Sequence, residues 1–261
     1  MLLVIDVGNS NTVFGVYRNE AADAAELVQH FRIETARQKT SDEYGILFLE
    51  LLRAKGVDPK QLGHAIIASV VPTLTQTFAR VCSDYCGVEA LIVGPGVKTG
   101  MSILYENPKE VGADRIVNAV AAFEWAKQSV IVVDLGTATT LDVVSQKGEY
   151  LGGAIVPGIG ISMEALFLRA SKLPRIELVR PKSVIGKNTV AAMQAGILIG
   201  YAGLIDELVR RTQVELGYKA RVVATGGLAG LVAEESKTIE TVDEMLTLTG
   251  LQLIWRRNRL P

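Results

Sequence analysis

The sequence predicts an α/β protein built from two similar halves. Three strand-like segments near the N-terminus are followed by alternating helical and strand-like segments, an order typical of α/β domains. The segment "VIDVGNSNTVF" near the start has a counterpart in "VVDLGTATTLD" near the middle of the chain. A repeat at this distance indicates two duplicated halves rather than a short-period solenoid. We expect the boundary near Asn118, which gives domains 1–118 and 119–261.

Local patterns predict each element of the first half. Continuous apolar runs predict strands, the first three of which form an antiparallel meander. Thr40 and Glu43 have the spacing of a capping box at the start of a helix that Gly56 ends. Pro108 is suited to the first turn of another helix. The predicted strands are 2–5, 13–17, 27–33, 65–69 and 90–93, and the predicted helices are 40–56, 72–85 and 108–127.

The second half repeats this order and adds one long helix or a kinked pair of helices over 188–216. We expect strands at 130–134, at 139–144, near 154 and from 222, and a helix from about 160. The apolar stretch 190–205 contains a glutamine and several glycines, so we expect a buried helix rather than a membrane span. Gly196, Gly200 and Gly203 would let another helix approach closely, either across a subunit interface or within the chain.

Composition and charge exclude several classes of partner. The formal net charge is −1 and the estimated pI is 6.2, so no strong field attracts nucleic acid or an anionic membrane. The N-terminus lacks the features of a secretion signal, which predicts a cytoplasmic protein. The basic C-terminal segment 255–261 is expected to be a solvated tail.

The two repeated turns have the chemistry of a phosphate site. Each follows a strand with Asp-x-Gly and then small residues with hydroxyl or amide groups. Glycine permits close approach of a ligand, the amide and hydroxyl groups can donate to phosphate oxygens, and the aspartate can hold a cation. One such turn could be a plain hairpin, but two copies favour a nucleotide site. Neither a P-loop nor a dinucleotide-binding fingerprint is present in the sequence.

The segment "YENPKEVGADRIVNA" places two charged residues in an apolar helical pattern. Asp114 could accept a proton from a substrate hydroxyl, and Arg115 could bind a carboxylate or a phosphoryl group. The alternative is a structural salt bridge, but adjacent residues point in different directions on a helix. We therefore favour a functional role for both.

Together these segments resemble the type III pantothenate kinases, within the superfamily of actin, sugar kinases and Hsp70 ATPases. The resemblance covers nearly the whole chain. It implies duplicated actin-like (ribonuclease H-like) domains, each with a mixed sheet, a leading antiparallel meander and flanking helices. The segments that carry it are "DVGNSNTVFGVY", "TSDEYG", "YENPKEVGADRIVN", "VVDLGTATTLDVV", "GGAIVPGIGISMEAL" and "ATGGLAGLV".

The resemblance implies phosphorylation of pantothenate to 4'-phosphopantothenate by ATP, the first step of coenzyme A biosynthesis. It implies that Asp114 is the general base and that Asp134 binds a monovalent cation, K⁺ or NH₄⁺. A divalent cation such as Mg²⁺ would lie near Asp6 through the phosphates, and the protein would be a homodimer. The implied ATP-binding residues are Asp6, Gly8, Asn9, Ser10, Asn11, Thr12, Val13 and Thr137. The implied pantothenate-binding residues are Tyr105, Gly112, Ala113, Asp114, Arg115 and Thr189.

Three other functions are compatible with parts of the pattern. The paired turns alone would suit another small-molecule kinase of the superfamily, whereas the segment from Tyr105 to Arg115 favours pantothenate. A nucleotide-binding accessory or regulatory protein without kinase activity would not need the carboxylate of Asp114. A filament-forming actin relative would be expected to be longer.

Overall fold

The computed structural model describes residues 1–21 and 24–259 and contains two mixed sheets flanked by helices, which confirms the predicted α/β class. The chain forms two compact units. Unit 1 comprises Met1–Met101, Glu106–Ala121 and Thr247–Pro261, and unit 2 comprises Ser102–Tyr105 and Ala122–Leu246. The domain boundary at residue 118 stays a prediction. The compact units differ from it by assigning the last segment of the chain to unit 1.

The sheet of unit 1 has the order β3-β2-β1-β4-β5. Strand β1 pairs antiparallel with β2 and parallel with β4, and β2 pairs antiparallel with β3. The carboxyl ends of β1 and β4 therefore lie at one edge of the sheet, together with the turn from β1 to β2. The strands are β1 (Leu2–Val7), β2 (Asn11–Ala21), β3 (Ala24–Glu34), β4 (His64–Ser69) and β5 (Ala90–Ile92).

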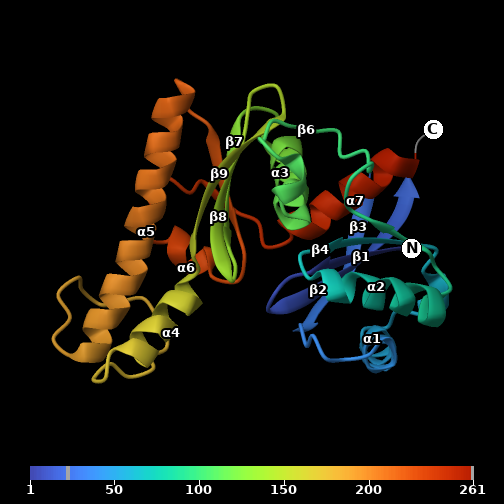
Figure 1. Ribbon diagram of the computed structural model, residues 1–261, viewed down its shortest axis with the longest axis horizontal. Coiled ribbons are helices and arrows are strands. Elements are labelled where there is room, and N and C mark those ends of the chain that lie inside the picture. Colours follow the sequence, from blue (N-terminus) through green and yellow to red (C-terminus); the bar gives the residue numbers. More distant parts are fainter. Residues whose placement is uncertain (22–23, 260–261) are drawn as a thin grey trace. The chain divides into compact units, whose positions relative to one another are not determined.

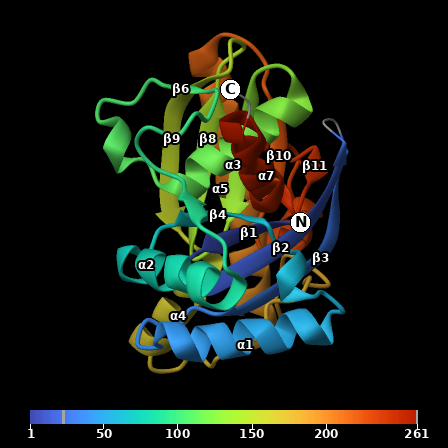
Figure 2. The same ribbon diagram turned by 90° about the vertical axis from the view of Figure 1, so that its right-hand side faces the viewer.

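Helices cover the sheet of unit 1 (Figures 1 and 2). Leu3, Ile5 and Val7 of β1 face the core that α1 (Ser41–Ala54) and α2 (Pro72–Arg80) complete. The alternate positions face the other way, and Gly15, the partner of Val4 in β2, lies against Leu248 of α7 (Leu246–Arg259). Thr40 and Glu43 form the predicted capping box of α1. A π-helical turn, η2 (Val81–Tyr85), continues α2, and a short 3₁₀ turn, η1 (Pro59–Gln61), precedes β4.

The helix predicted over 108–127 is interrupted. A 3₁₀ turn, η3 (Pro108–Glu110), ends at Val111, which is extended with φ −76° and ψ 121°, and α3 (Ala113–Ala126) begins after it. The side chain of Asn107 accepts a hydrogen bond from the Lys109 N–H, which stabilises the separate turn. The prediction of one helix is therefore wrong, and the break places Asp114 in the first turn of α3.

The C-terminal segment is a helix through Arg259, so the prediction of a solvated tail is wrong for those residues. Helix α7 (Leu246–Arg259) buries Trp255, whose ring centroid lies 5.1 Å from that of His64. Gly250 packs so closely against α3 that a Cβ atom there would lie 2.2 Å from the Val117 carbonyl oxygen. The apolar residues of this segment recur at helical spacing, and their burial stabilises a helix although the segment is basic. The last two residues of the predicted tail lie outside the described residues.

The sheet of unit 2 has the order β11-β10-β7-β8-β9-β6. Strand β7 pairs antiparallel with β8, β8 pairs antiparallel with β9, and β10 pairs parallel with β7. Strand β7, with an antiparallel neighbour β8 and a parallel neighbour β10, thus has the same kinds of partner as β1, which lies between antiparallel β2 and parallel β4. The strands are β6 (Ser102–Ile103), β7 (Val130–Leu135), β8 (Ala138–Val144), β9 (Glu149–Pro157), β10 (Arg221–Thr225) and β11 (Thr241–Val242).

The long helix of unit 2, α5 (Thr189–Leu216), packs along the sheet with α6 (Ala229–Ala233), while α4 (Ile159–Arg169) precedes it in the chain (Figure 1). Among the described residues, α5 is the one helix whose length and mean hydropathy would allow it to cross a membrane. Seven of its side chains are buried, and Leu198, Ile205 and Val209 are among those in the core of unit 2. This packing agrees with the predicted core helix.

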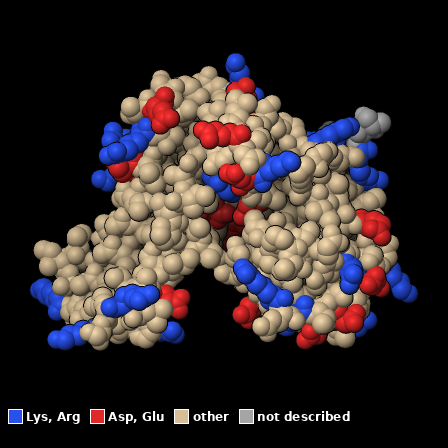
Figure 3. All heavy atoms as spheres, viewed as in Figure 1, with Lys and Arg blue, Asp and Glu red and all other residues tan. Residues whose placement is uncertain are grey.

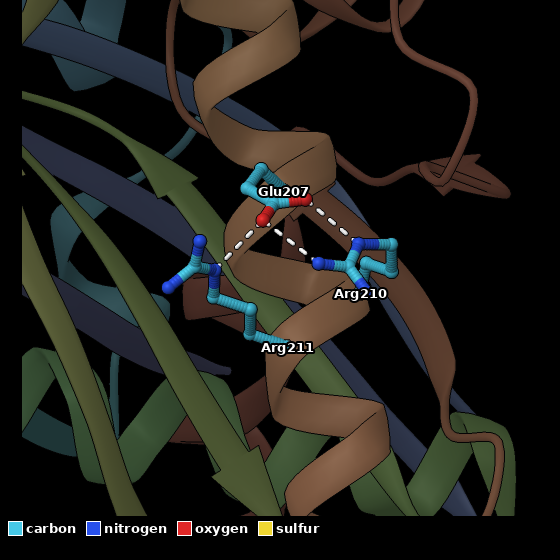
Figure 4. A network of polar contacts seen from close by, with 3 residues as sticks. All are labelled: Glu207, Arg210 and Arg211. Atoms are coloured by element: carbon cyan, nitrogen blue, oxygen red, sulfur yellow. Dashed lines mark hydrogen bonds and ion pairs between the residues drawn. The ribbon is translucent and has the colours of Figure 1, made fainter.

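Two parts of α5 are exposed to solvent within unit 2: the face that carries Gly196, Gly200 and Gly203, and the charged cluster of Glu207, Arg210 and Arg211. A Cβ atom added at Gly196, Gly200 or Gly203 would meet no atom within 4 Å, so the described chain does not fill this face. Near the other end, Glu207 accepts hydrogen bonds from Arg210 and Arg211 (Figure 4). The hydrogen bond from Arg210, which has the largest effect, and the one from Arg211 lower the pKa of Glu207 to about 2. Exposed ion pairs such as these two contribute little to the free energy of unfolding.

Candidate active site

The turn from β1 to β2, which we call the phosphate turn (Gly8–Asn11), presents polar groups to solvent. The Gly8 N–H donates to the Asn11 carbonyl oxygen at 3.0 Å, and a Cβ at Gly8 would lie only 2.9 Å from that oxygen. Asn9, Ser10 and Asn11 are exposed. Thr12 and Val13 belong to β2, where Thr12 is buried and Val13 pairs with Asp6 of β1. A tight glycine turn with exposed amides suits an anionic ligand.

A second segment, which we call the supporting segment (Thr35–Lys39), holds the phosphate turn. The Thr35 N–H donates to the Ser10 carbonyl oxygen at 3.0 Å, and the hydroxyl groups of Thr12 and Thr35 lie 3.0 Å apart in the interior. The sequence patterns do not single out this segment. The nearest signal is the adjacent "TSDEYG" stretch, which predicts a helix start and carries part of the resemblance to the family.

Asp114 lies in the first turn of α3, beside Gly112. Its Oδ1 accepts a hydrogen bond from the Arg115 N–H at 2.8 Å, and a Cβ at Gly112 would lie 2.5 Å from that same oxygen. Burial raises the pKa of Asp114, against the opposing effects of the Arg115 N–H and the Arg115 charge. Arg115 itself is buried. A desolvated carboxylate of raised pKa is suited to accept a proton near neutral pH.

Within unit 1, the structure brings the Asp114 segment to the same sheet edge as the phosphate turn. The Val70 N–H, just after β4, donates to the carbonyl oxygen of Val7 at the end of β1. Gly112 lies next to Val70, because a Cβ on the glycine would be 3.5 Å from Val70 Cγ1. Ligands of α/β proteins bind at the carboxyl ends of parallel strands. Asp6, the phosphate turn and Asp114 thus share one edge of one sheet.

The counterpart turn in unit 2 follows β7 and is one residue shorter. Aligning the two segments by their Asp and Gly residues predicts that Thr140 matches Thr12. In the structure Thr12 pairs with Val7 and Thr139 pairs with Leu135, so Thr139 takes the place of Thr12 and that prediction is shifted by one residue. Thr137 is exposed and Asp134 is partly exposed at the end of its strand. A carboxylate beside backbone carbonyls offers the oxygen ligands that hard cations prefer.

No cage of protein side chains for a metal ion occurs in residues 1–21 and 24–259. Groups of three or more His, Cys, Asp or Glu side chains with suitable positions are absent from this part of the chain. Asp6 and Asp134 could each supply one carboxylate, which fits an ion that takes its remaining oxygen ligands from phosphate, water or backbone.

Tyr105 and Thr189 lie elsewhere in unit 2. The Tyr105 ring lies against Gly152 of β9, where a Cβ would be 3.2 Å from it, and 6.4 Å from the ring of Tyr150. The Tyr150 hydroxyl donates to the fully buried Asp142 at 2.7 Å. This buried pair fixes the surface on which Tyr105 rests.

Thr189 is the first residue of α5 and is exposed. It lies on a groove of about 530 Å³ that Leu166, Met193 and Gly196 also line. Within unit 2 it is therefore at the α4–α5 groove rather than at the Asp134 turn. Lys, Arg, Asp and Glu side chains are interspersed over the face shown in Figure 3, so that face carries no broad patch of one sign.

Comparison with known proteins gives one consistent family. Residues 2–211 match the family model described as type III pantothenate kinase. The type III pantothenate kinase of Myxococcus xanthus is 57% identical over 258 residues, covering 99% of both chains. That of Anaeromyxobacter sp. is 59% identical over 259 residues, covering 99% of this chain and all of the relative.

Solved structures with low sequence identity share the fold. A conserved Baf family protein from Campylobacter jejuni aligns with a TM-score of 0.61 at 19% identity, over 98% of both chains. The ethanolamine utilization protein EutJ from Carboxydothermus hydrogenoformans aligns with a TM-score of 0.56 at 14% identity, over 97% of this chain and 89% of its own. At these identities the likeness concerns the fold alone.

Proposed function

Because this chain belongs to the type III pantothenate kinase family, we propose that it transfers the γ-phosphoryl group of ATP to pantothenate. The product is 4'-phosphopantothenate, and the reaction serves coenzyme A biosynthesis. The observation that carries the assignment is the match to relatives of that name over 99% of the chain at 57–59% identity. The geometry of Asp114 agrees with it, since phosphoryl transfer to an alcohol needs a carboxylate placed to accept the hydroxyl proton.

Asp114 acts as the general base in this proposal. The primary hydroxyl oxygen of pantothenate attacks the γ-phosphorus, the bond to the β-phosphate oxygen breaks, and ADP leaves. The hydroxyl proton passes to the Asp114 carboxylate, whose raised pKa increases its basicity. Arg115 adds a positive charge beside the Asp114 carboxylate. Pantothenate is held by Tyr105, Gly112, Ala113, Asp114, Arg115 and Thr189.

ATP is bound through the two Asp-x-Gly turns, one supplied by each unit. The exposed groups of the phosphate turn donate to phosphate oxygens, and Thr137 donates from the second turn. The repeated pairing around β1 and β7 supports duplicated actin-like domains, each led by an antiparallel meander. The ATP-binding residues are Asp6, Gly8, Asn9, Ser10, Asn11, Thr12, Val13 and Thr137.

Two cations complete the proposed site, and the enzyme works in the cytoplasm. Asp134 would hold K⁺ or NH₄⁺, and Asp6 would help to bind Mg²⁺ that the ATP phosphates carry. These ions would neutralise phosphate charge. The carboxylates at the ends of β1 and β7 are the side chains that fit this role.

The assay that tests the proposed function follows ADP release with pantothenate present or absent, in K⁺ and again in Na⁺ alone. We expect release only with pantothenate, and faster release in K⁺ than in Na⁺, as the proposed binding of K⁺ at Asp134 requires. ADP release that does not depend on pantothenate would indicate another substrate. Binding of ATP without any release would favour the accessory or regulatory protein.

The open face of α5 supports the proposed homodimer. Leu166, which lines the groove, is exposed at 39%, and Leu168 of α4 and Val184 and Ile185 of the segment before α5 are exposed at 65%, 72% and 79%. Apolar patches of this kind mark association surfaces. Thr189 lies on the same groove, so a second copy seated there would bring a substrate-binding residue to the interface.

We expect Gly196→Arg to convert the dimer into a monomer and to lower activity. A Cβ atom at Gly196 would meet no side chain or distant backbone atom within 4 Å and the position is exposed, so the substitution should leave the subunit folded while blocking close approach of a partner. Light scattering after size exclusion gives the mass. Arg211→Ala, at the far end of the same helix, is the control and should leave a dimer. A wild-type protein of monomeric mass would contradict this proposal.

A further inference from the structure

The supporting segment places one exposed cationic residue, Arg37, beside the phosphate turn. Arg37 Nη2 donates a hydrogen bond to Asn9 Oδ1 at 2.9 Å. Asn9 is exposed in the middle of the turn. Arg37 thus links the supporting segment to a side chain at the proposed phosphate site.

The chemistry of a guanidinium group determines how the Asn9 amide is turned. Arginine has donors and no acceptor, so only the carbonyl oxygen of the amide can face it. The Asn9 NH₂ group, with two donors, then points away from Arg37. Arginine in this position therefore presents the amide donors of Asn9 to an anionic ligand.

The segment that carries Arg37 is firmly anchored. The hydroxyl group of the fully buried Tyr44 accepts a hydrogen bond from the Ala36 N–H at 2.8 Å and donates one to the Ala36 carbonyl oxygen at 2.9 Å. Thr35 is bonded to the phosphate turn through both its backbone and its hydroxyl. The two residues that precede position 37 are therefore fixed, which reduces the entropy lost when the turn binds its ligand.

We propose that Arg37 is a positioning residue for ATP, which orients the Asn9 amide toward the phosphate groups. The proposal rests on the proposed function, in which residues 6–13 bind the ATP phosphates. The "TSDEYG" stretch then gains a second role besides starting α1, because its Tyr44 anchors the supporting segment.

Calorimetric binding of a non-hydrolysable ATP analogue, with Mg²⁺, tests this inference apart from turnover. We expect Arg37→Ala to weaken binding about tenfold, the effect of about one lost charge-assisted hydrogen bond. Arg37→Lys keeps a cationic donor and should bind within about threefold of wild type. Arg53→Ala is the matched control, since Arg53 is an exposed arginine of unit 1 bonded to Glu50 of its own helix. It should bind like wild type.

Steady-state kinetics and a double-mutant cycle separate positioning from a general structural effect. In Arg37→Ala we expect the KM for ATP to rise about tenfold while the KM for pantothenate and the melting temperature stay unchanged. Asn9→Ala should weaken nucleotide binding too, and the double variant should bind no more than about twofold weaker than Asn9→Ala alone. This non-additivity is what positioning through Asn9 requires.

Two results would overturn the inference. One is nucleotide binding by Arg37→Ala within twofold of wild type. The other is a double variant in which the two losses multiply, since Arg37 would then act independently of Asn9. Because the analogue reports binding without transfer, a failure of pantothenate phosphorylation in the wild type would be recognised separately.

Discussion

Asp114→Asn should lose at least two orders of magnitude in kcat while it binds ATP almost as well as the wild type. General-base catalysis contributes about 10²- to 10⁴-fold, and an amide cannot accept the proton. The substitution preserves the size of the side chain and the hydrogen bond from the Arg115 N–H. ADP release and binding of an ATP analogue are the two measurements. Turnover like that of the wild type would remove Asp114 from the reaction.

The pH dependence of the wild type gives a second check on Asp114. Activity requires the ionised carboxylate, so kcat/KM should fall as the pH drops through the raised pKa of Asp114. The free energy of unfolding changes in the opposite direction, since the contribution of Asp114 to stability rises as the pH falls. Because burial makes the folded pKa higher than the unfolded one, ionised Asp114 destabilises the protein at neutral pH, and this cost disappears as the pH falls. Asp114→Asn should therefore be at least as stable as the wild type at pH 7.

Gly112→Ala should lower kcat strongly with little change in stability. The new Cβ would lie 2.5 Å from Asp114 Oδ1, and the carboxylate must move away. The obstructing atom is the end of a side chain, which can rotate, so the backbone need not shift. A displacement of about 1 Å at a catalytic group costs on the order of 10²-fold in rate.

Turnover and thermal unfolding of Gly112→Ala are compared with those of Gly63→Ala. Gly63 has open space around its Cβ position and no positive φ, so its substitution is a matched control that should change neither measurement. If Gly112→Ala retained the rate of the wild type, the observed position of the Asp114 carboxylate would not be the one used in catalysis.

Local sequence signals predicted most of the strands and helix starts. The apolar run at 130–134 became β7, Asn188 caps α5, and the Thr40–Glu43 capping box opens α1. These signals succeed because they depend on neighbours within a few residues. The sequence patterns do not predict the break before α3, where Asn107 stabilises a separate 3₁₀ turn, or the helix at the C-terminus, where Trp255 is buried and lies near His64, a residue distant in the sequence.

The sequence by itself determined the kind of chemistry that this protein performs. Two Asp-x-Gly turns indicate a phosphate site and the Gly-Ala-Asp-Arg segment a proton acceptor, because donor and acceptor types are properties of the residues themselves, and the resemblance of these segments to the type III pantothenate kinases implies the family. Only the tertiary structure decided that Asp114 lies against Gly112 at the edge that also carries the phosphate turn. It also decided that Arg37, 28 residues from Asn9, turns the Asn9 amide. Such contacts depend on strand pairing and burial across the fold, which spacing along the chain does not encode.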